Sequence, residues 1–181
     1  HSILYSGSTF GEGLITGHRA TVREKSNFGK HCLISTLTDI QGNSKFGDFC
    51  RIYSNVHICE DSEIGNFTFI YPYTIFTNDR VPPSDNIKGP KVGDFTVIAV
   101  HSILLPGIII GSNCLVGANT LITKDINDFS FVAGSPGKII CDVRDLKDSD
   151  GKNHYPWPYN FSRGMPWEDM GFENWRRDNG Y

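Results

Sequence analysis

The sequence has little of what marks several common functional classes. No run reaches the roughly 18 consecutive apolar residues of a membrane span, so we expect no membrane insertion. A net charge of −3 provides no broad basic surface, which argues against nucleic acid as a partner. The five cysteines include no Cys-x-x-Cys pair and their number is odd, so we expect free thiols and a cytoplasmic location rather than a disulfide scaffold.

Helical periodicity is also missing before residue 140, and a six-residue repeat takes its place. The repeat is anchored at every sixth position from Phe10 to Phe76, and again from Val92 to Ile122. Seventeen of these eighteen anchors are apolar, with Thr16 as the exception. Four residues after most anchors stands a small side chain, usually Ser, Thr or Cys. A regular repeat of this length predicts a solenoid.

Glycine follows the anchor once in eighteen residues, so three hexads make one turn. The series is Gly11, Gly29, Gly47 and Gly65, then Gly93 and Gly111. Strand alternation points the small residue and the next anchor inward, and we expect glycine to supply the corner angles. The repeat therefore predicts an all-β, three-sided parallel β-helix of six coils, 10–81 and 92–127, about 29 Å tall. Among the small inward residues are Cys32, Cys50 and Cys114, which we expect to be reduced core residues.

The chain divides into a β-helix domain, 1–141, with a loop insertion at 82–91, and a C-terminal extension, 142–181. The extension is rich in aromatic residues and too apolar to stay free in solvent. We expect it to pack on its own column or on a neighbouring subunit, or to help close the substrate site. Its prolines predict mostly irregular structure, with one short helix near Glu168–Arg177.

Insertions in regular solenoids commonly carry function. Asn78 and Asp79 lie at a corner just before the insertion, and stacking by eighteens places Asn55, His57 and His101 on the adjoining face. We predict that these five side chains surround one substrate-sized cleft. The candidate catalytic residues are Asn78, His57 and His101, and the candidate substrate-binding residues are Asn55 and Asp79.

The segments Val116–Ile126 and Val132–Ile140 resemble the last coils of bacterial sugar acetyltransferases, within the left-handed β-helix, hexapeptide-repeat acyltransferases. The left hand is implied by this resemblance alone, because parallel crossovers are usually right-handed. The resemblance also implies a homotrimer that uses acetyl-CoA as co-substrate and needs no metal.

The resemblance further implies a groove for acetyl-CoA along the last coils. Ala99, Gly117 and Ala118 would face the pantetheine arm, and Lys124 and Lys138 would face the phosphates.

The acceptor is indicated by the corner at Asn78. Many O-acetyltransferases of this family have a general-base histidine there, and asparagine cannot accept a proton. The stretch Phe76–Arg80 instead resembles the nucleotide-linked amino-sugar N-acetyltransferases, in which an asparagine orients the amine. A neutral amine is nucleophilic, so positioning and oxyanion stabilisation suffice. The resemblance favours N-acetylation of a nucleotide-linked amino sugar by direct attack on the thioester in a ternary complex.

Three alternatives remain open. One is O-acetylation of a glycan or a small-molecule hydroxyl, with His57 or His101 as the base; the aromatic tail is similar to acyltransferases of polysaccharide biosynthesis. The second is a β-helix scaffold without catalytic activity. The third is a γ-type carbonic anhydrase, whose zinc site includes a His-x4-His pair that this sequence lacks.

Overall fold

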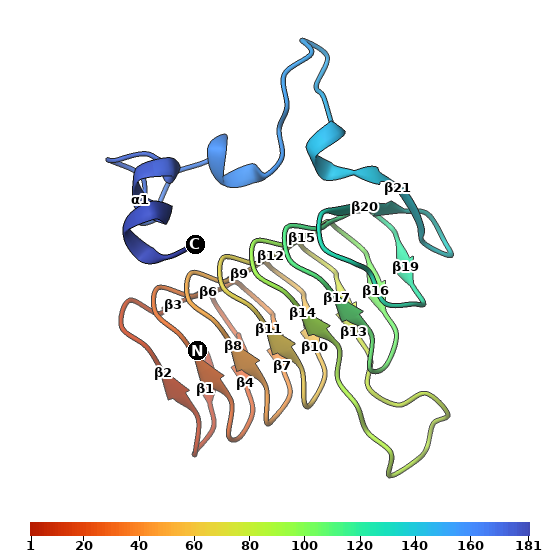
Figure 1. The fold of residues 1–181 in the computed structure, drawn as a ribbon. Helices are drawn as coiled ribbons and strands as arrows, with labels where there is room; N and C mark the ends of the chain where they lie inside the picture. The colour runs from red at the N-terminus through yellow and green to blue at the C-terminus, as the bar shows by residue number, and fades with distance from the viewer.

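The computed structural model describes all 181 residues and shows a three-sided column of short parallel strands with a tail along one side (Figure 1). From β1 to β16, each strand pairs in parallel with the strand three places later in the chain. Leu33 pairs with Arg51, for example, so one coil takes eighteen residues. The predicted left-handed parallel β-helix is confirmed.

We name the three sheets faces A, B and C. Face A comprises β1 (Ile3–Leu4), β4 (Thr21–Val22), β7 (Asp39–Ile40), β10 (His57–Ile58), β13 (Ile75–Phe76), β16 (Ile103–Leu104) and β19 (Leu121–Ile122). Face B comprises β2 (Thr9–Phe10), β5 (Asn27–Phe28), β8 (Lys45–Phe46), β11 (Glu63–Ile64), β14 (Lys91–Val92) and β17 (Ile109–Ile110). Face C comprises β3 (Ile15–Thr16), β6 (Leu33–Ile34), β9 (Arg51–Ile52), β12 (Phe69–Ile70), β15 (Val97–Ile98), β18 (Leu115–Val116), β20 (Ser130–Ala133) and β21 (Lys138–Asp142).

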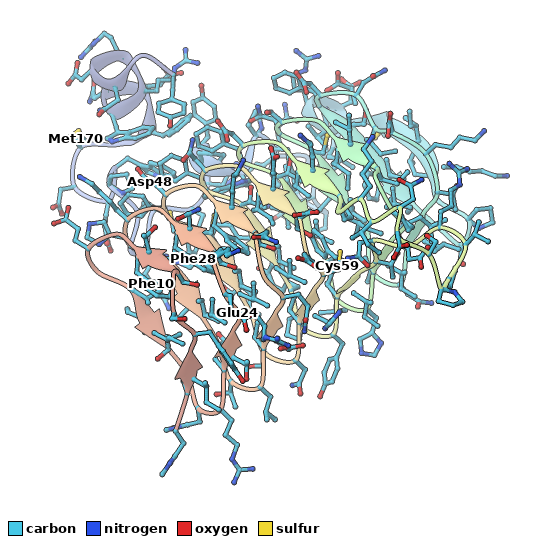
Figure 2. All side chains as sticks on the ribbon, turned by 90° about the horizontal axis from the view of Figure 1, so that it is seen from below. Phe10, Glu24, Phe28, Asp48, Cys59 and Met170 are labelled. Atoms are coloured by element: carbon cyan, nitrogen blue, oxygen red, sulfur yellow. The ribbon has the colours of Figure 1, made fainter.

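The anchors of the hexads fill the interior of the column. Identical positions in neighbouring coils stack, as the rings of Phe10 and Phe28 do with centroids 5.4 Å apart (Figure 2). The inward cysteines Cys32, Cys50 and Cys114 are free thiols with no exposed surface, as predicted. The apolar interior excludes water along its length and supplies the main stabilisation of the column.

The inward hydroxyl residues keep their hydrogen bonds inside this core. Thr38 donates to the carbonyl of Tyr53 at 2.7 Å, and Thr96 donates to that of Gly111 at 2.8 Å. Thr120, in the last coil, has the one buried side-chain oxygen without a hydrogen-bond partner. Apart from Thr120, the small polar residues therefore fill the interior without the cost of an unpaired buried group.

The expectation that the glycines of the eighteen-residue series supply the corner angles is wrong. The left-handed corners carry other residues, such as Lys25 and Asn43, with φ of 59° and 56°. The series glycines instead lie where neighbouring coils approach closely: a Cβ on Gly29 would stand 2.7 Å from the backbone nitrogen of Asp48. The Asp48 carboxylate uses that space to accept the amide of Lys30 at 2.7 Å.

The column starts earlier than predicted, and its insertion has different limits. β1 pairs with β4, so the regular coils begin before Phe10. The chain leaves the column after Asn78 and rejoins it at Lys88, whose amide donates to the Asn78 carbonyl at 2.8 Å. The protruding loop is therefore 79–87, because residues 88–91 have already resumed the coil (Figure 1).

The C-terminal end of the column is closed by a feature that the repeat did not predict. β20 continues face C in parallel, and β21 folds back on it as an antiparallel hairpin. The Leu121 amide donates to the Gly134 carbonyl at 3.1 Å, and the Gly137 amide donates to the Leu121 carbonyl at 2.8 Å. The hairpin thereby occupies the hydrogen-bonding edge of the last coil.

The tail then runs back along the column toward its N-terminal half (Figure 1). It contains two short 3₁₀ helices, Val143–Asp145 and Trp157–Tyr159, and the helix α1, Phe172–Asn179. The predicted Glu168–Arg177 helix thus starts and ends slightly later. No helix in the chain combines the length and the apolar character needed to cross a membrane.

Aromatic packing holds the tail against the corner between faces B and C. The buried cluster joins Phe67, Phe69 and Phe95 of the column with Trp157, Met165, Trp167 and Trp175 of the tail. The Trp157 indole donates to the Phe95 carbonyl at 2.8 Å, and Arg51 donates to the Gly164 carbonyl at 2.8 Å. The tail thus packs on the column of its own chain, and the two form a second, smaller hydrophobic core.

Candidate active site

Face A changes character along the column. Its outward positions, in register from one coil to the next, are Asp39, His57, Ile75, Ile103 and Leu121. The lower coils therefore present charged and polar groups, and the upper coils present an apolar strip. His57 stands at the boundary between the two.

Asp39 fixes the orientation of the His57 imidazole. The Asp39 carboxylate lies 3.2 Å from Nδ1 of His57, and it also accepts from the amide side chain of Gln41 at 2.7 Å. An imidazole that donates from Nδ1 to a carboxylate keeps the lone pair of Nε2 available. This carboxylate–imidazole pair has the arrangement of a general base.

The corner between faces C and A carries a second column of candidates. Asn55, Tyr73, His101 and Asn119 occupy equivalent left-handed corner positions in four successive coils, with φ of 59°, 62°, 60° and 56°. The rings of Tyr73 and His101 meet edge to face, with centroids 5.0 Å apart. Asparagine and histidine tolerate this backbone region better than most residues, and it directs their side chains outward.

These two rows enclose a shallow hollow on face A, which we call the histidine hollow. Its volume is about 450 Å³, and it is lined by Asn55, His57, Tyr73, Ile75, His101, Ile103 and Asn119. The structure thus brings together three predicted site residues, Asn55, His57 and His101. Asn78 and Asp79 do not line this hollow and lie beyond the other end of β13, at the corner between faces A and B.

Asn78 and Asp79 organise the base of the protruding loop. The side chain of Asn78 lies 3.5 Å from the Glu60 carbonyl, one coil below. The Asp79 carboxylate accepts from the Ser84 amide at 2.7 Å and from its hydroxyl at 2.8 Å. Partial desolvation acts to raise the pKa of Asp79, but the hydrogen bonds from Ser84 and Val81 outweigh it, and the net shift is downward. The Asp79 carboxylate therefore stabilises the base of the loop by accepting hydrogen bonds from Val81 and Ser84.

The predicted coenzyme residues lie near the C-terminal end of the column. Ala99 and Gly117 follow β15 and β18, and their amides donate to the carbonyls of Val116 and Val132 at 2.9 Å and 2.8 Å. Ala118 is exposed at the next position. Gly117 lies beneath the hairpin, where an added Cβ would stand 3.1 Å from that of Ala133. Because Ala99, Gly117 and Ala118 have small side chains or none, little side-chain volume projects from the column at this edge.

Both predicted phosphate-binding lysines are exposed at the same end of the column, on different faces. Lys124 follows β19 of face A, and Lys138 begins β21 of face C. A lysine with a free ammonium group is suited to a phosphate. No group of three His, Cys, Asp or Glu side chains that could hold a metal ion occurs in the chain.

Asp39 and Gln41 were missed by the reasoning from sequence. The signal was present, because Asp39 lies eighteen residues before His57, and that spacing stacks residues in neighbouring coils. Tyr73 is also part of the hollow and stands eighteen residues after Asn55. The same register that located the histidines therefore predicts their neighbours.

Comparison with known proteins places the repeat in a described family. The family model for the bacterial transferase hexapeptide (six repeats) matches residues 89–124. The galactoside O-acetyltransferase of Escherichia coli strain K12 is 36% identical over 64 residues, which cover 35% of this chain and 30% of that protein. The chain thus spans about a third of the length of the curated relatives that it matches.

Two solved structures share the fold. PerB from Caulobacter crescentus, in complex with CoA and GDP-perosamine, superposes with a TM-score of 0.55 at 19% identity, over 77% of this chain and 58% of that one. A point mutant of AntD, an N-acyltransferase from Bacillus cereus, in complex with dTDP and coenzyme A, gives a TM-score of 0.57 at 18% identity, over 74% of this chain and 83% of that one. This chain therefore carries the bacterial transferase hexapeptide repeat on a left-handed β-helix and resembles the hexapeptide-repeat acyltransferases.

Proposed function

We propose that this chain is an acetyl-CoA-dependent acetyltransferase that acts on a sugar. The observation that carries the proposal is the histidine hollow. This recess on the hexapeptide-repeat column has both polar and apolar lining residues, and one of them, His57, has its imidazole next to the Asp39 carboxylate. The similar proteins support the same reaction class, because PerB and AntD were solved with CoA and the Escherichia coli relative is named an O-acetyltransferase.

The acceptor that we favour is a nucleotide-linked amino sugar. PerB was solved with GDP-perosamine and AntD with dTDP, so nucleotide-linked ligands occur on this fold. Asn78 supports an amine acceptor, because its side chain can orient an amine but cannot remove a proton. In this proposal Asn78 and Asp79 act at the loop, and the hollow with Asn55 holds the sugar.

The transfer needs no covalent intermediate on the protein. The neutral acceptor amine attacks the thioester carbonyl through its lone pair. The nitrogen then loses a proton, the amide bond forms as the carbon–sulfur bond breaks, and the departing CoA thiolate takes up a proton. Nε2 of His57 is placed to take the proton from the amine, because Asp39 holds Nδ1. Lys124 and Lys138, with Ala99, Gly117 and Ala118, would hold the coenzyme.

O-acetylation is a second candidate, and the Asp39–His57 pair favours it. A hydroxyl needs a base, since its own pKa lies far above neutrality. The sequence indicated His57 as a candidate base, and the distance of 3.2 Å between Asp39 and its Nδ1 supports that choice with an orienting partner that had not been predicted. His101 contacts Tyr73 and is the less favoured base of the two.

We also propose that the chain assembles as a homotrimer in the cytoplasm. Support for an additional subunit comes from face A, where Ile75 and Ile103 remain 39% and 37% exposed beside the hollow. A neighbouring copy on this face would shield the reacting groups from water and could bring its own Asn78 loop to the hollow.

Calorimetric titration with acetyl-CoA tests the proposal first, and acceptor panels follow. We expect micromolar affinity at about one site per chain. Acetyl transfer to nucleotide-linked amino sugars, but not to the corresponding sugars with a hydroxyl in place of the amine, would support N-acetylation; the reverse preference would support the O-acetylation candidate. A folded protein that does not bind acetyl-CoA would overturn the acyltransferase proposal altogether.

A further inference from the structure

The tail and the column together enclose a second recess, which we call the aromatic hollow. Its volume is about 170 Å³. The column contributes Tyr53, Phe69, Tyr71 and Val97. The tail contributes Tyr155, Trp157 and Phe161. Residues from about sixty to about a hundred positions apart in the chain therefore meet around a space large enough for a single ring.

The walls of this hollow are held rigidly. Trp157 meets Phe69 edge to face with centroids 4.8 Å apart, and its indole is fixed to the Phe95 carbonyl. Tyr53 and Tyr71, from neighbouring coils, pack with centroids 4.8 Å apart. A preformed aromatic recess needs no rearrangement to bind a flat ring, which lowers the entropic cost of binding.

Three phenol groups at the hollow lack partners within the chain. The Tyr159 hydroxyl, outside the hollow, donates to Glu173 at 2.8 Å, whereas those of Tyr53, Tyr71 and Tyr155 make no such bond. Burial raises the pKa of Tyr155 to about 12 and that of Tyr53 to a smaller extent. A tyrosine in partly dry surroundings normally finds a hydrogen-bond partner, and here a ligand can supply it.

The lining contains no charged residue, which selects a neutral ligand. Arg51, two residues before Tyr53, is not free to bind a phosphate, because its guanidinium donates to the carbonyls of His31 and Gly164. A nucleotide in the hollow would leave its diphosphate without a nearby cation. The chemistry that remains is an apolar ring face with hydroxyl groups at its edge, which is the chemistry of a sugar.

The aromatic hollow lies around one corner from the histidine hollow. Tyr53 and Tyr71 border the first, and Asn55 and Tyr73, two residues further along each coil, border the second. Two residues of extended chain span at most about 7 Å. The lining residues of the two hollows are therefore neighbours on the same coils, as contact with adjacent rings of one oligosaccharide requires.

We propose that the aromatic hollow binds a neutral pyranose ring of a glycan acceptor, next to the ring held at the histidine hollow. The apolar face of the sugar packs on the aromatic walls, and its hydroxyls bond to the free phenols. The identity of the neighbouring ring as an acetyl acceptor rests on the proposed function, but the binding of a neutral sugar does not.

Ligand-observed NMR titration of the full chain tests this, with maltotriose, cellotriose and N,N′,N″-triacetylchitotriose as probes. We expect at least one trisaccharide to bind with a Kd of about 5 mM or tighter. Tyr71→Ala removes a wall and should weaken that binding at least about fivefold, and Tyr71→Phe, which removes only the hydroxyl, should weaken it less. Tyr5→Ala, an exposed tyrosine of the first coil, is the matched control and should change nothing.

The outcomes separate this proposal from the acetyltransferase proposal. Trisaccharide binding that depends on Tyr71 supports the sugar subsite, whether or not acetyl transfer is found. Absence of binding for all three probes, or equal binding by Tyr71→Ala, overturns it. Tighter, Tyr71-dependent binding of UDP or GDP would assign the hollow to a nucleotide and also overturn it. Loss of acetyl-CoA affinity in Tyr71→Ala would do the same by assigning the hollow to the coenzyme.

Discussion

Asp39 and His57 stack in neighbouring coils of face A, with the carboxylate 3.2 Å from Nδ1 of the imidazole. The sequence places them eighteen residues apart, and the parallel register turns that spacing into contact. Gln41 also donates to Asp39 at 2.7 Å, and the same carboxylate oxygen, Oδ2, faces both Gln41 and His57. The pair leaves Nε2 of His57, a residue that lines the histidine hollow, without a hydrogen-bond partner in the chain.

This pair predicts a graded loss of activity. His57→Gln should lower turnover about 100-fold or more, because a protein base is removed. Asp39→Asn keeps the imidazole but not its orientation, and should cost about tenfold. His18→Gln, at an exposed corner, serves as the control. Undiminished turnover in His57→Gln would exclude it as the base.

The loop corner predicts a different kinetic effect. Asn78→Ala should lower turnover at least about tenfold by misplacing the acceptor, with acetyl-CoA affinity unchanged in a calorimetric titration. Asn86→Ala, in the same protruding loop, has an exposed side chain without a hydrogen bond and is the matched control. Equal turnover in both variants would remove Asn78 from the acceptor site.

The column could be predicted from sequence because its geometry is periodic. Eighteen residues return the chain to the same corner, so a count along the sequence stacked Asn55, His57 and His101 onto one region, and the histidine hollow contains all three. The same count contained Asp39, which was overlooked. It also placed Asn78 near the histidines, although β13 separates that residue from the hollow in one chain.

The parts that the periodicity did not predict depend on contacts without a repeat. The β20–β21 hairpin forms because the last coil has unpaired backbone groups at its edge. The residue spacing of the repeat contains no signal for this hairpin. The aromatic hollow needs Trp157 to reach Phe95 across sixty-two residues of sequence. The aromatic content of the tail predicted that the tail packs against protein surface. Which corner of the column it packs against is decided by tertiary contacts alone.

Two glycines of one coil provide a test of the corner geometry. An added Cβ on Gly47 would lie 2.6 Å from the backbone nitrogen of Asn66, whereas on Gly42 its nearest neighbour is the Glu24 carbonyl oxygen at 3.0 Å. Gly47→Ala should therefore destabilise the protein by about 1–3 kcal/mol through overpacking, and Gly42→Ala by less. Thermal unfolding of both variants measures the difference. Equal melting temperatures would refute the close-approach explanation.

The tail should be separable from the column by one substitution. Trp167 is 1% exposed in the aromatic cluster, so Trp167→Ala should cost about 3–5 kcal/mol of tail packing. Because the column has its own core, we expect hydrogen exchange to rise in residues 154–181 while the coils stay protected. Met170→Ala removes a side chain that is 50% exposed and is the control (Figure 2). Uniform exchange through the chain would show one cooperative unit instead.

Alkaline titration should loosen the tail through Tyr155. Burial raises the pKa of its phenol to about 12, against about 10 in the unfolded chain. A raised phenol pKa means that the folded state keeps its proton longer, so this contribution to stability is complete below pH 10 and is lost as the pH rises toward 12. Tryptophan fluorescence, followed with tyrosinate absorbance, should report tail release in that window. In Tyr155→Phe the alkaline loss of stability should be smaller than in the parent chain. Tyr5→Phe, which changes an exposed tyrosine, is the control and should behave as the parent chain. If Tyr155→Phe shows the same alkaline transition as the parent chain, the effect belongs to another group.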